Sequence, residues 1–290
     1  MSGSGSSYRA DKFNLKYFLL FLLIAFGWTW LWWSLFVTGT LTMPEGTGTP
    51  QFDLRDSEPV MLIVLISPFG PTIAGFAVTA LSEGKQGVRK LWKRFVHGGF
   101  SWKWWLILLS FYAVLRLVMR YSSQFFFNVA QPDYTYIKTP WMLIPPILAS
   151  ILHGGLSEEF GWRGYALRHL QAKFPAAISA LILGFIEGCW HIPLVFLPGD
   201  MRFGMTLFSL IYPYLAVGIF RAWIYNNTNG SVLAAVMFHM TGNIVSEIIP
   251  INIPYRQYHD MIHLLAALFI FMRFGNQDLK INGEKGHNIN

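Results

Sequence analysis

Three polar clusters interrupt the hydrophobic stretches of this chain, and their residue types are those that hydrolytic chemistry uses. They are Glu158-Glu159-x-x-x-Arg163, His191 and His239-x-x-x-Asn243. A charged side chain at the centre of a bilayer costs roughly 2.5 to 3.5 kcal/mol on insertion scales, so buried ionisable groups are usually functional. We therefore interpret the three clusters as parts of one buried site.

The composition indicates a membrane protein. Of 290 residues, 53% are hydrophobic and only 13% are charged, and the mean hydropathy is +0.40, whereas soluble domains carry about 25% charged residues. The apolar residues fall in blocks of about 20, the length of a membrane-spanning helix, rather than in the alternating segments of a β-barrel. We therefore predict an all-α, polytopic membrane protein.

The apolar blocks predict about eight transmembrane helices within a single domain, residues 13–274. Residues 1–12 are predicted to form a flexible N-terminal tail and residues 275–290 a cytoplasmic C-terminal tail. The predicted spans are 13–38, 59–81, 104–127, 140–170, 175–197, 203–225, 231–250 and 258–274.

The basic residues predict the orientation of these spans. With the N-terminus inside, 16 of the 22 Lys and Arg residues fall in cytoplasmic segments, including Arg163 and Arg221, and four fall in outer loops, including Arg202. Arg116 and Arg120 lie within the third span. The positive-inside rule then places both termini in the cytoplasm. The net charge of +7 is explained by topology, so we expect no nucleic-acid partner.

Helix geometry assigns different roles to the two adjacent carboxylates. Glu158 and Glu159 lie about 100° apart around a helix, so only one of them can face a given cavity. Glu159 and Arg163 stand at i and i+4 with the acid first, the favoured order for a helical ion pair. We therefore expect Glu159 to be a supporting residue and Glu158 to be the free carboxylate.

The predicted helical hairpin places Glu158 and His191 at the same depth in the membrane. If the turn lies near Phe174 and Pro175, each residue is about 24 Å along its helix from the turn. In the seventh span, His239 and Asn243 stand at i and i+4 and share a face.

These groups have the chemistry for hydrolysis of a peptide bond. Glu158 and His191 can deprotonate a water, while His239 and Asn243 can donate hydrogen bonds to a developing oxyanion. Alternatively, Glu158, His191 and His239 could hold zinc with a water as the fourth ligand. The sequence has no H-E-x-x-H motif, and Asn243 is a good donor and a poor zinc ligand, so no cofactor is favoured.

The three motifs resemble those of the CAAX prenyl endopeptidase and bacteriocin-processing (CPBP, also called Abi) family of membrane peptidases. The matching runs are Glu158-Glu159-Phe160-Gly161-Trp162-Arg163, Trp190-His191-Ile192-Pro193 and His239-Met240-Thr241-Gly242-Asn243. They occur in the family's order, within a four-helix catalytic core at about residues 140–250.

The resemblance implies an eight-helix intramembrane protease with a cavity open to the cytoplasm and to lipid. It implies Glu158 and His191 as water activators, His239 and Asn243 as oxyanion stabilisers, and Glu159 with Arg163 as support. It also implies that the substrate is a membrane-associated protein or peptide, either a prenylated protein that loses a C-terminal tripeptide or a bacterial peptide undergoing processing.

One position departs from the family pattern. Four residues before the second-motif histidine the family usually has an aromatic residue, and here the residue is Glu187. Glu187 shares a helix face with His191. We expect it to be either a buried acid paired with Arg116, Arg120 or His191, or an extra metal ligand or a group that tunes the basicity of His191.

Two other classes of protein use similar features. A non-enzymatic scaffold or chaperone subunit with this fold would not need the complete set of polar groups that this chain retains. A proton-coupled transporter also buries Glu and His, but its characteristic pair of broken helices in matching halves is not evident in the sequence.

Overall fold

The computed structural model describes residues 12–41, 58–96, 99–134, 136, 139–252 and 256–281. Over these residues the regular secondary structure is entirely helical, and five helical segments are long and apolar enough to cross a membrane. They are Leu15–Val37, Leu62–Val96, Trp102–Phe127, Ala176–Phe196 and Leu207–Asn227. The prediction of an all-α, polytopic membrane protein is confirmed. Residues 1–11 of the predicted N-terminal tail lie outside the described residues.

The eight predicted spans all coincide with helical segments. The α-helices are α1 (Leu15–Val37), α2 (Glu58–Ile66), α3 (Gly70–Val96), α4 (Trp102–Phe127), α5 (Ile144–Ser150), α6 (Ser157–Gly161), α7 (Arg168–Leu170), α8 (Ala176–Trp190), α9 (Leu207–Asn227), α10 (Val232–Ile248) and α11 (Arg256–Phe274). Short 3-10 helices cover Ser67–Phe69, Pro140–Leu143 and Ile192–Phe196, and π-helical turns cover Ile151–Leu156 and Trp162–Leu167.

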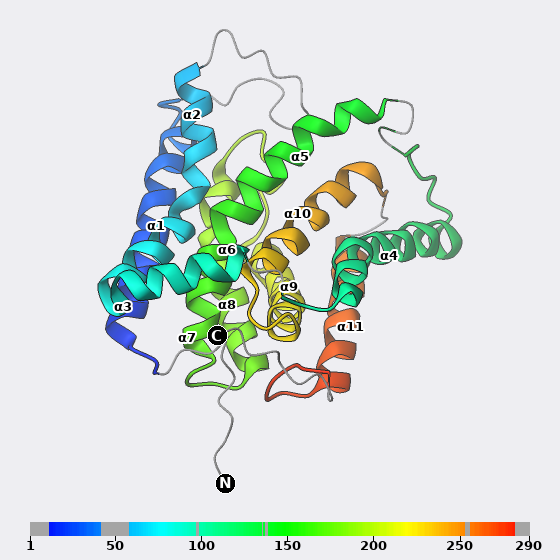
Figure 1. Ribbon diagram of the computed structural model, residues 1–290. Coiled ribbons are helices and arrows are strands. Elements are labelled where there is room, and N and C mark those ends of the chain that lie inside the picture. Colours follow the sequence, from blue (N-terminus) through cyan, green and yellow to red (C-terminus); the bar gives the residue numbers. More distant parts are fainter. Residues whose placement is uncertain are drawn as a thin grey trace.

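The helices that carry the polar clusters lie in the middle of the molecule. Helices α6, α8, α9 and α10 occupy the centre, with α1, α2 and α3 on one side and α4 and α11 on the other (Figure 1). Helix α1 packs against α3, α3 against α6, α8 against α9, α9 against α11, and α10 against α4. Large apolar side chains on the outer helices remain exposed, among them Leu23 on α1 and Phe125 on α4, as expected for surfaces that hydrocarbon would cover.

Polar side chains fix the start of three helices. Asn14, Thr206 and Ser231 precede α1, α9 and α10, and the side-chain oxygen of each accepts a hydrogen bond from a backbone N–H three residues later. This N-cap satisfies one of the amides that a helix start leaves without a partner.

The start of α8 is capped from the far end of the chain. Pro175 offers no capping side chain, and the amides of Ala176 and Ala177 donate to the carbonyls of Gln277 and Asn276 at 2.9 and 3.1 Å. Residues 275–281 were predicted to belong to a tail, but here they fold back and hold the first turn of α8.

Glycines allow α8 and α9 to approach closely. A Cβ at Gly184 of α8 would lie 2.4 Å from the carbonyl oxygen of Tyr214, and one at Gly218 of α9 would lie 2.5 Å from that of Ala180. Small residues of this kind let membrane helices make close backbone contact. The consequence is that the polar side chains on the facing surfaces of α8 and α9 reach one another.

The fourth predicted span, residues 140–170, is helical but is not one regular α-helix. Two π-helical turns flank the short helix α6, which carries Glu158 and Glu159. Thr72 of α3 donates a 2.8 Å hydrogen bond to the carbonyl of Leu156, inside the first π-turn. Wide turns of this kind are frequent at functional sites, because they turn side chains away from the regular helical spacing.

Candidate active site

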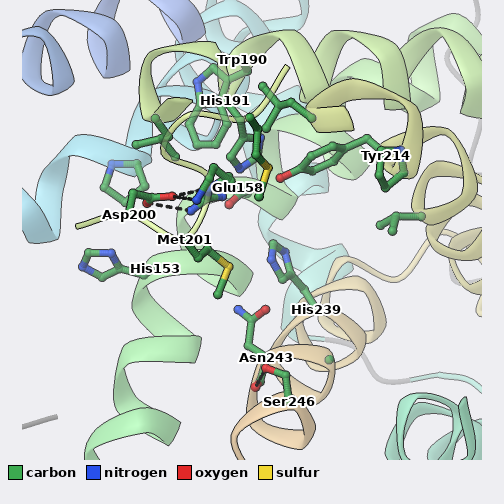
Figure 2. A pocket seen from close by; sticks show the side chains of 18 of the residues that line it. His153, Glu158, Trp190, His191, Asp200, Met201, Tyr214, His239, Asn243 and Ser246 are labelled. Atoms are coloured by element: carbon green, nitrogen blue, oxygen red, sulfur yellow. Dashed lines mark hydrogen bonds and ion pairs between the residues drawn. The ribbon is translucent and has the colours of Figure 1, made fainter. Parts of the chain in front are cut away.

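The four residues predicted to act on the substrate line a single cavity. Glu158 of α6, His191 at the end of α8, and His239 and Asn243 of α10 all contribute to the wall of a cavity of about 660 Å³ (Figure 2). A cavity of this size is ordinary for a ligand site. The structure therefore brings together residues that are 85 positions apart in the sequence, from Glu158 to Asn243.

Three contacts fix the orientation of the His191 ring. Its Nδ1 lies 2.8 Å from the backbone carbonyl oxygen of Glu187. Because a carbonyl only accepts, Nδ1 carries the hydrogen and Nε2 of the neutral ring keeps its lone pair. The ring stacks on Tyr214, with centroids 4.7 Å apart, and meets Trp190 edge to face. His191 can therefore accept a proton from a water in the cavity.

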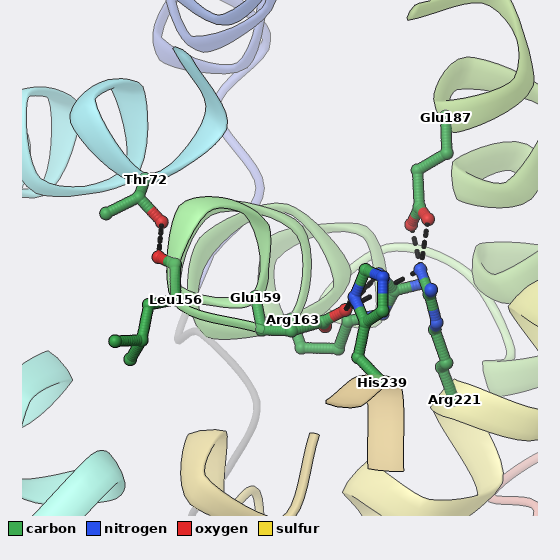
Figure 3. Close-up of polar contacts among 7 residues, drawn as sticks. All are labelled: Thr72, Leu156, Glu159, Arg163, Glu187, Arg221 and His239. Carbon is green, nitrogen blue, oxygen red and sulfur yellow. Dashed lines mark hydrogen bonds and ion pairs between the residues drawn. The ribbon is translucent and has the colours of Figure 1, made fainter. Parts of the chain in front are cut away.

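Beside the cavity, two carboxylates and two guanidiniums form what we call the four-charge network, made of Glu159, Arg163, Glu187 and Arg221 (Figure 3). Arg163 lies 3.2 Å from Glu159 and 2.5 Å from Glu187, between the nearest nitrogen and oxygen atoms. Arg221 lies 2.8 Å from Glu187 and 3.5 Å from Glu159. Each acid thus faces both cations, and the network is neutral.

The four-charge network is almost completely buried. The exposed fraction of the side chain is 0% for Glu159, 1% for Glu187 and Arg163, and 8% for Arg221. Removing one member of a buried ion pair leaves an uncompensated charge, which typically destabilises a protein by about 3 to 5 kcal/mol. Glu158, one residue from Glu159, points into the cavity instead (Figure 2).

The structure corrects the expected partner of Glu187. We predicted Arg116, Arg120 or His191, but the Glu187 carboxylate binds Arg163 and Arg221. Arg163 and Arg221 were counted among the cytoplasmic charges of the chain, and both are instead buried beside the site.

The network also holds His239. Nδ1 of His239 lies 2.8 Å from Oε1 of Glu159, which accepts its hydrogen (Figure 3). The carboxylate of Glu159 therefore orients the ring and leaves Nε2 facing the cavity.

Gly154 leaves room at the point where His239 and Asn243 converge. A Cβ at Gly154, in the first π-turn, would lie 2.9 Å from both His239 Nε2 and Asn243 Nδ2. Asn243 Nδ2 always carries hydrogens, whereas His239 Nε2 carries one only in the imidazolium form. Two nitrogens around one open point form the geometry of an oxyanion site.

Several cavity residues were missed in the sequence. Arg202 lies in the segment between α8 and α9 and was predicted to be in an outer loop, yet it lines the cavity and is held by Asp200 at 2.8 Å. Tyr214 and Arg221 line it from α9. The buried acid Glu187 could have predicted Arg221, because a buried carboxylate needs a cation close to it.

Glu158, His191 and His239 were named as zinc ligands only in the alternative mechanism. Glu158, His191 and His239 share the cavity, but within the described residues no three His, Cys, Asp or Glu side chains are arranged to hold a metal ion. Nδ1 of each histidine is engaged by an acceptor of the protein, which leaves Nε2 as the only ring nitrogen that could bind a metal. We therefore derive no step through a metal.

Two comparisons show which known proteins this chain is similar to. Residues 140–245 match the family of type II CAAX prenyl endopeptidase Rce1-like proteins. Over 207 residues the chain is 26% identical to CAAX prenyl protease 2 of Methanococcus maripaludis, covering 66% of this chain and 74% of that protein.

Fold and site together define a class, the polytopic helical membrane proteins with a cavity lined by a buried glutamate and histidines. Within that class, the match over residues 140–245 contains all three motifs. In this region the chain is similar to CAAX prenyl proteases, and the comparisons support a membrane hydrolase.

The geometry at Gly154 makes a prediction. We expect Gly154→Ala to lower kcat by about 100-fold, the typical effect of losing one oxyanion donor, because the new methyl group would occupy the point that His239 and Asn243 face. Cleavage of a peptide substrate by the purified variant measures the effect. Gly27→Ala in α1 is the matched control, since a Cβ there meets nothing within 4 Å. Full activity of Gly154→Ala would show that this point is not used in the reaction.

Proposed function

We propose that this protein is an intramembrane endopeptidase that cleaves a peptide bond of a membrane-associated protein or peptide with an activated water. The observation that carries the proposal is the convergence of Glu158, His191, His239 and Asn243 on one cavity. The same four residues stand in the motifs that the resemblance assigns to catalysis.

In the proposed first step, a water between Glu158 and His191 loses a proton as it attacks the peptide carbonyl. The Glu158 carboxylate and the Nε2 lone pair of His191 are the acceptors that face the cavity. General base catalysis of this kind typically contributes about 10² to 10⁴ in rate. Glu158 rather than Glu159 fills this role, since Glu159 is held by two arginines and His239.

In the second step, the oxygen of the tetrahedral intermediate occupies the space beside Gly154. Asn243 Nδ2 donates to it, and His239 Nε2 faces the same point and can donate once its ring gains a proton. The intermediate then collapses, the carbon–nitrogen bond breaks, and the proton taken from water passes to the leaving amine. Glu159, Arg163 and Glu187, joined by Arg221, support this step by fixing His239 and neutralising one another.

The proposed substrate carries a lipid chain near the scissile bond. The cavity also has apolar lining residues, which include Trp33, Phe36, Leu194, Leu197 and Leu210. The relative from Methanococcus maripaludis is named a CAAX prenyl protease. Prenylated C-terminal peptides are therefore the first substrates to test, and we propose, from the distribution of basic residues, that both chain termini face the cytoplasm.

We predict that Glu158→Gln and His191→Ala each lower kcat by about 100-fold or more, because each removes a proton acceptor. Purified variants cleaving a fluorogenic prenylated peptide in detergent measure the loss. The control is Cys189→Ala, since Cys189 lies near His191 in α8 but does not line the cavity. If wild type and all variants behave alike, the protein is not a protease of this peptide and the proposal fails.

Metal dependence is a separate prediction. Since the proposed steps use only protein groups and water, we expect a chelator to leave the activity of the wild-type enzyme unchanged. Metal analysis of the same sample accompanies the titration. A stoichiometric zinc whose removal abolishes activity, and whose return restores it, would contradict the mechanism and assign Glu158, His191 and His239 as ligands.

A further inference from the structure

Helix α3 changes direction at Gly84, and its last part is a separate amphipathic helix. Gly84 has φ 65° and ψ −164°, a conformation that is essentially restricted to glycine. Residues 85–96, which follow it, run crosswise to α1 and toward α6 (Figure 1). They include no acidic residue and five basic ones, a net charge of +5. We call this segment the basic helix, and its charged residues are Lys85, Arg89, Lys90, Lys93 and Arg94.

The aromatic side chains of the basic helix pack on α6, the helix that carries Glu158 and Glu159. The Trp92 ring stacks on that of Phe160, with centroids 5.8 Å apart and planes 8° from parallel. The ring of Phe95 lies 5.1 Å from the same ring, between centroids. Since Phe160 directly follows Glu159, these contacts hold α6 against the basic helix.

A second set of contacts joins the basic helix to the π-turn that follows α6. Leu91 is fully buried, and a Cβ at Gly164 would lie 2.6 Å from its Cδ1. Arg94 Nη1 donates to the Gly164 carbonyl at 3.1 Å. Gly164 directly follows Arg163 of the four-charge network, so the inner face of the basic helix supports this network from outside.

The opposite face of the basic helix is exposed and positively charged. At 100° per residue, the other four basic side chains point away from Leu91, and all four are exposed: Lys85, Arg89, Lys90 and Lys93. The carboxylate next to this segment in the sequence, that of Glu83, pairs with Arg168 and His169 instead. In the part of the chain that the structure describes, none of the four forms an ion pair.

This combination of faces is suited to the surface of a membrane. Interfacial helices have a basic face, an apolar face and often a tryptophan, and Trp92 is 52% exposed at the border between the two faces. The distribution of basic residues assigns the helix to the proposed cytoplasmic side, where bilayers carry their anionic lipids. The phosphate oxygens of such lipids accept charge-assisted hydrogen bonds from Lys and Arg.

We propose that the exposed face of the basic helix binds the headgroups of anionic phospholipids, and that the bound lipid stabilises α6 through the contacts at Phe160 and Gly164. The inference goes beyond the proposed protease function and does not depend on it, because lipid binding is measured without cleavage. It gives the chain a second ligand, held by residues that do not line the cavity.

The test measures the Tm of the purified protein in detergent as short-chain phosphatidylglycerol is added. Phosphatidylcholine of the same chain length and inorganic phosphate are titrated separately. Phosphatidylglycerol should raise the Tm of wild type and the other two should not, because only phosphatidylglycerol joins an anionic headgroup to apolar chains. The concentration that gives half of the rise is the apparent Kd.

The test variant combines Lys85→Gln, Lys90→Gln and Lys93→Gln. Each basic residue near an anionic surface adds about fivefold in affinity, and salt screens part of this gain. The apparent Kd for phosphatidylglycerol should therefore rise by about tenfold or more. Replacing the same three lysines by Arg keeps the charge and should leave the apparent Kd within about twofold of wild type.

The matched control combines Lys12→Gln, Lys16→Gln and Lys103→Gln. It removes the same charge from exposed lysines that lie outside the basic helix. Its apparent Kd for phosphatidylglycerol should equal that of wild type.

Three results would overturn the inference. Equal responses of wild type to phosphatidylglycerol and phosphatidylcholine would do so whatever the variants show. Equal losses of affinity in the two Gln variants would mean that binding follows overall charge and not the basic helix. A rise in Tm with inorganic phosphate as large as that with phosphatidylglycerol would show that the face binds a soluble anion and would reject the lipid.

Discussion

The structure depends on keeping two carboxylates and two guanidiniums buried together in charge balance. Taking an isolated charge out of water costs several kcal/mol, and only close, well-placed opposite charges offset it. In the four-charge network each acid contacts both cations, with nitrogen–oxygen distances from 2.5 to 3.5 Å. Because its members come from α6, the π-turn after it, α8 and α9, any change in how these helices pack would separate the charges.

This constraint also positions the groups that face the cavity. Glu159 holds His239 from α10 through Nδ1, so the network reaches a fourth helix. On α8, Glu187 is fixed by its two arginines, and its backbone carbonyl in turn holds His191. The network therefore orients His239 directly, whereas His191 is held by the α8 backbone at Glu187, and Glu158, a single residue away from Glu159, faces the cavity.

The position of Glu187 in the network explains why a buried acid is tolerated at this point of α8. A lone carboxylate there would be destabilising, but Arg221 on α9 supplies the compensating charge at 2.8 Å. The glycines at which α8 and α9 touch bring the two residues within reach of each other.

Much of this arrangement could be predicted from the sequence, because it follows from local geometry. The eight apolar blocks became helical segments, the i,i+4 spacing foretold the contact between Glu159 and Arg163, and equal depth in a hairpin placed Glu158 and His191 at one cavity. What escaped prediction depends on contacts between distant segments. Arg221 lies near a helix end, so counting basic residues assigned it to the cytoplasm, and Arg202 reaches the cavity only through the path of a loop.

The π-turns around Glu158 were also not predicted. The run Gly154-Gly155 permits several backbone conformations, and the choice among them is made by α3 and α10, whose Thr72 and Val236 contact this segment. The same holds for the cap of α8, which residues 275–281 provide from a hundred positions away.

The most direct test of the role of the four-charge network is a double-mutant cycle on Glu187 and Arg221. Thermal unfolding of the purified protein in detergent would be measured for Glu187→Gln, Arg221→Gln and the double variant. Each single variant leaves one buried charge uncompensated, so we expect a large fall in Tm for each. The double variant removes both charges, so its fall in Tm should be much smaller than the sum of the two single falls. This difference corresponds to a coupling free energy of about 3 kcal/mol. Strictly additive losses, or single variants as stable as wild type, would contradict this role of the network.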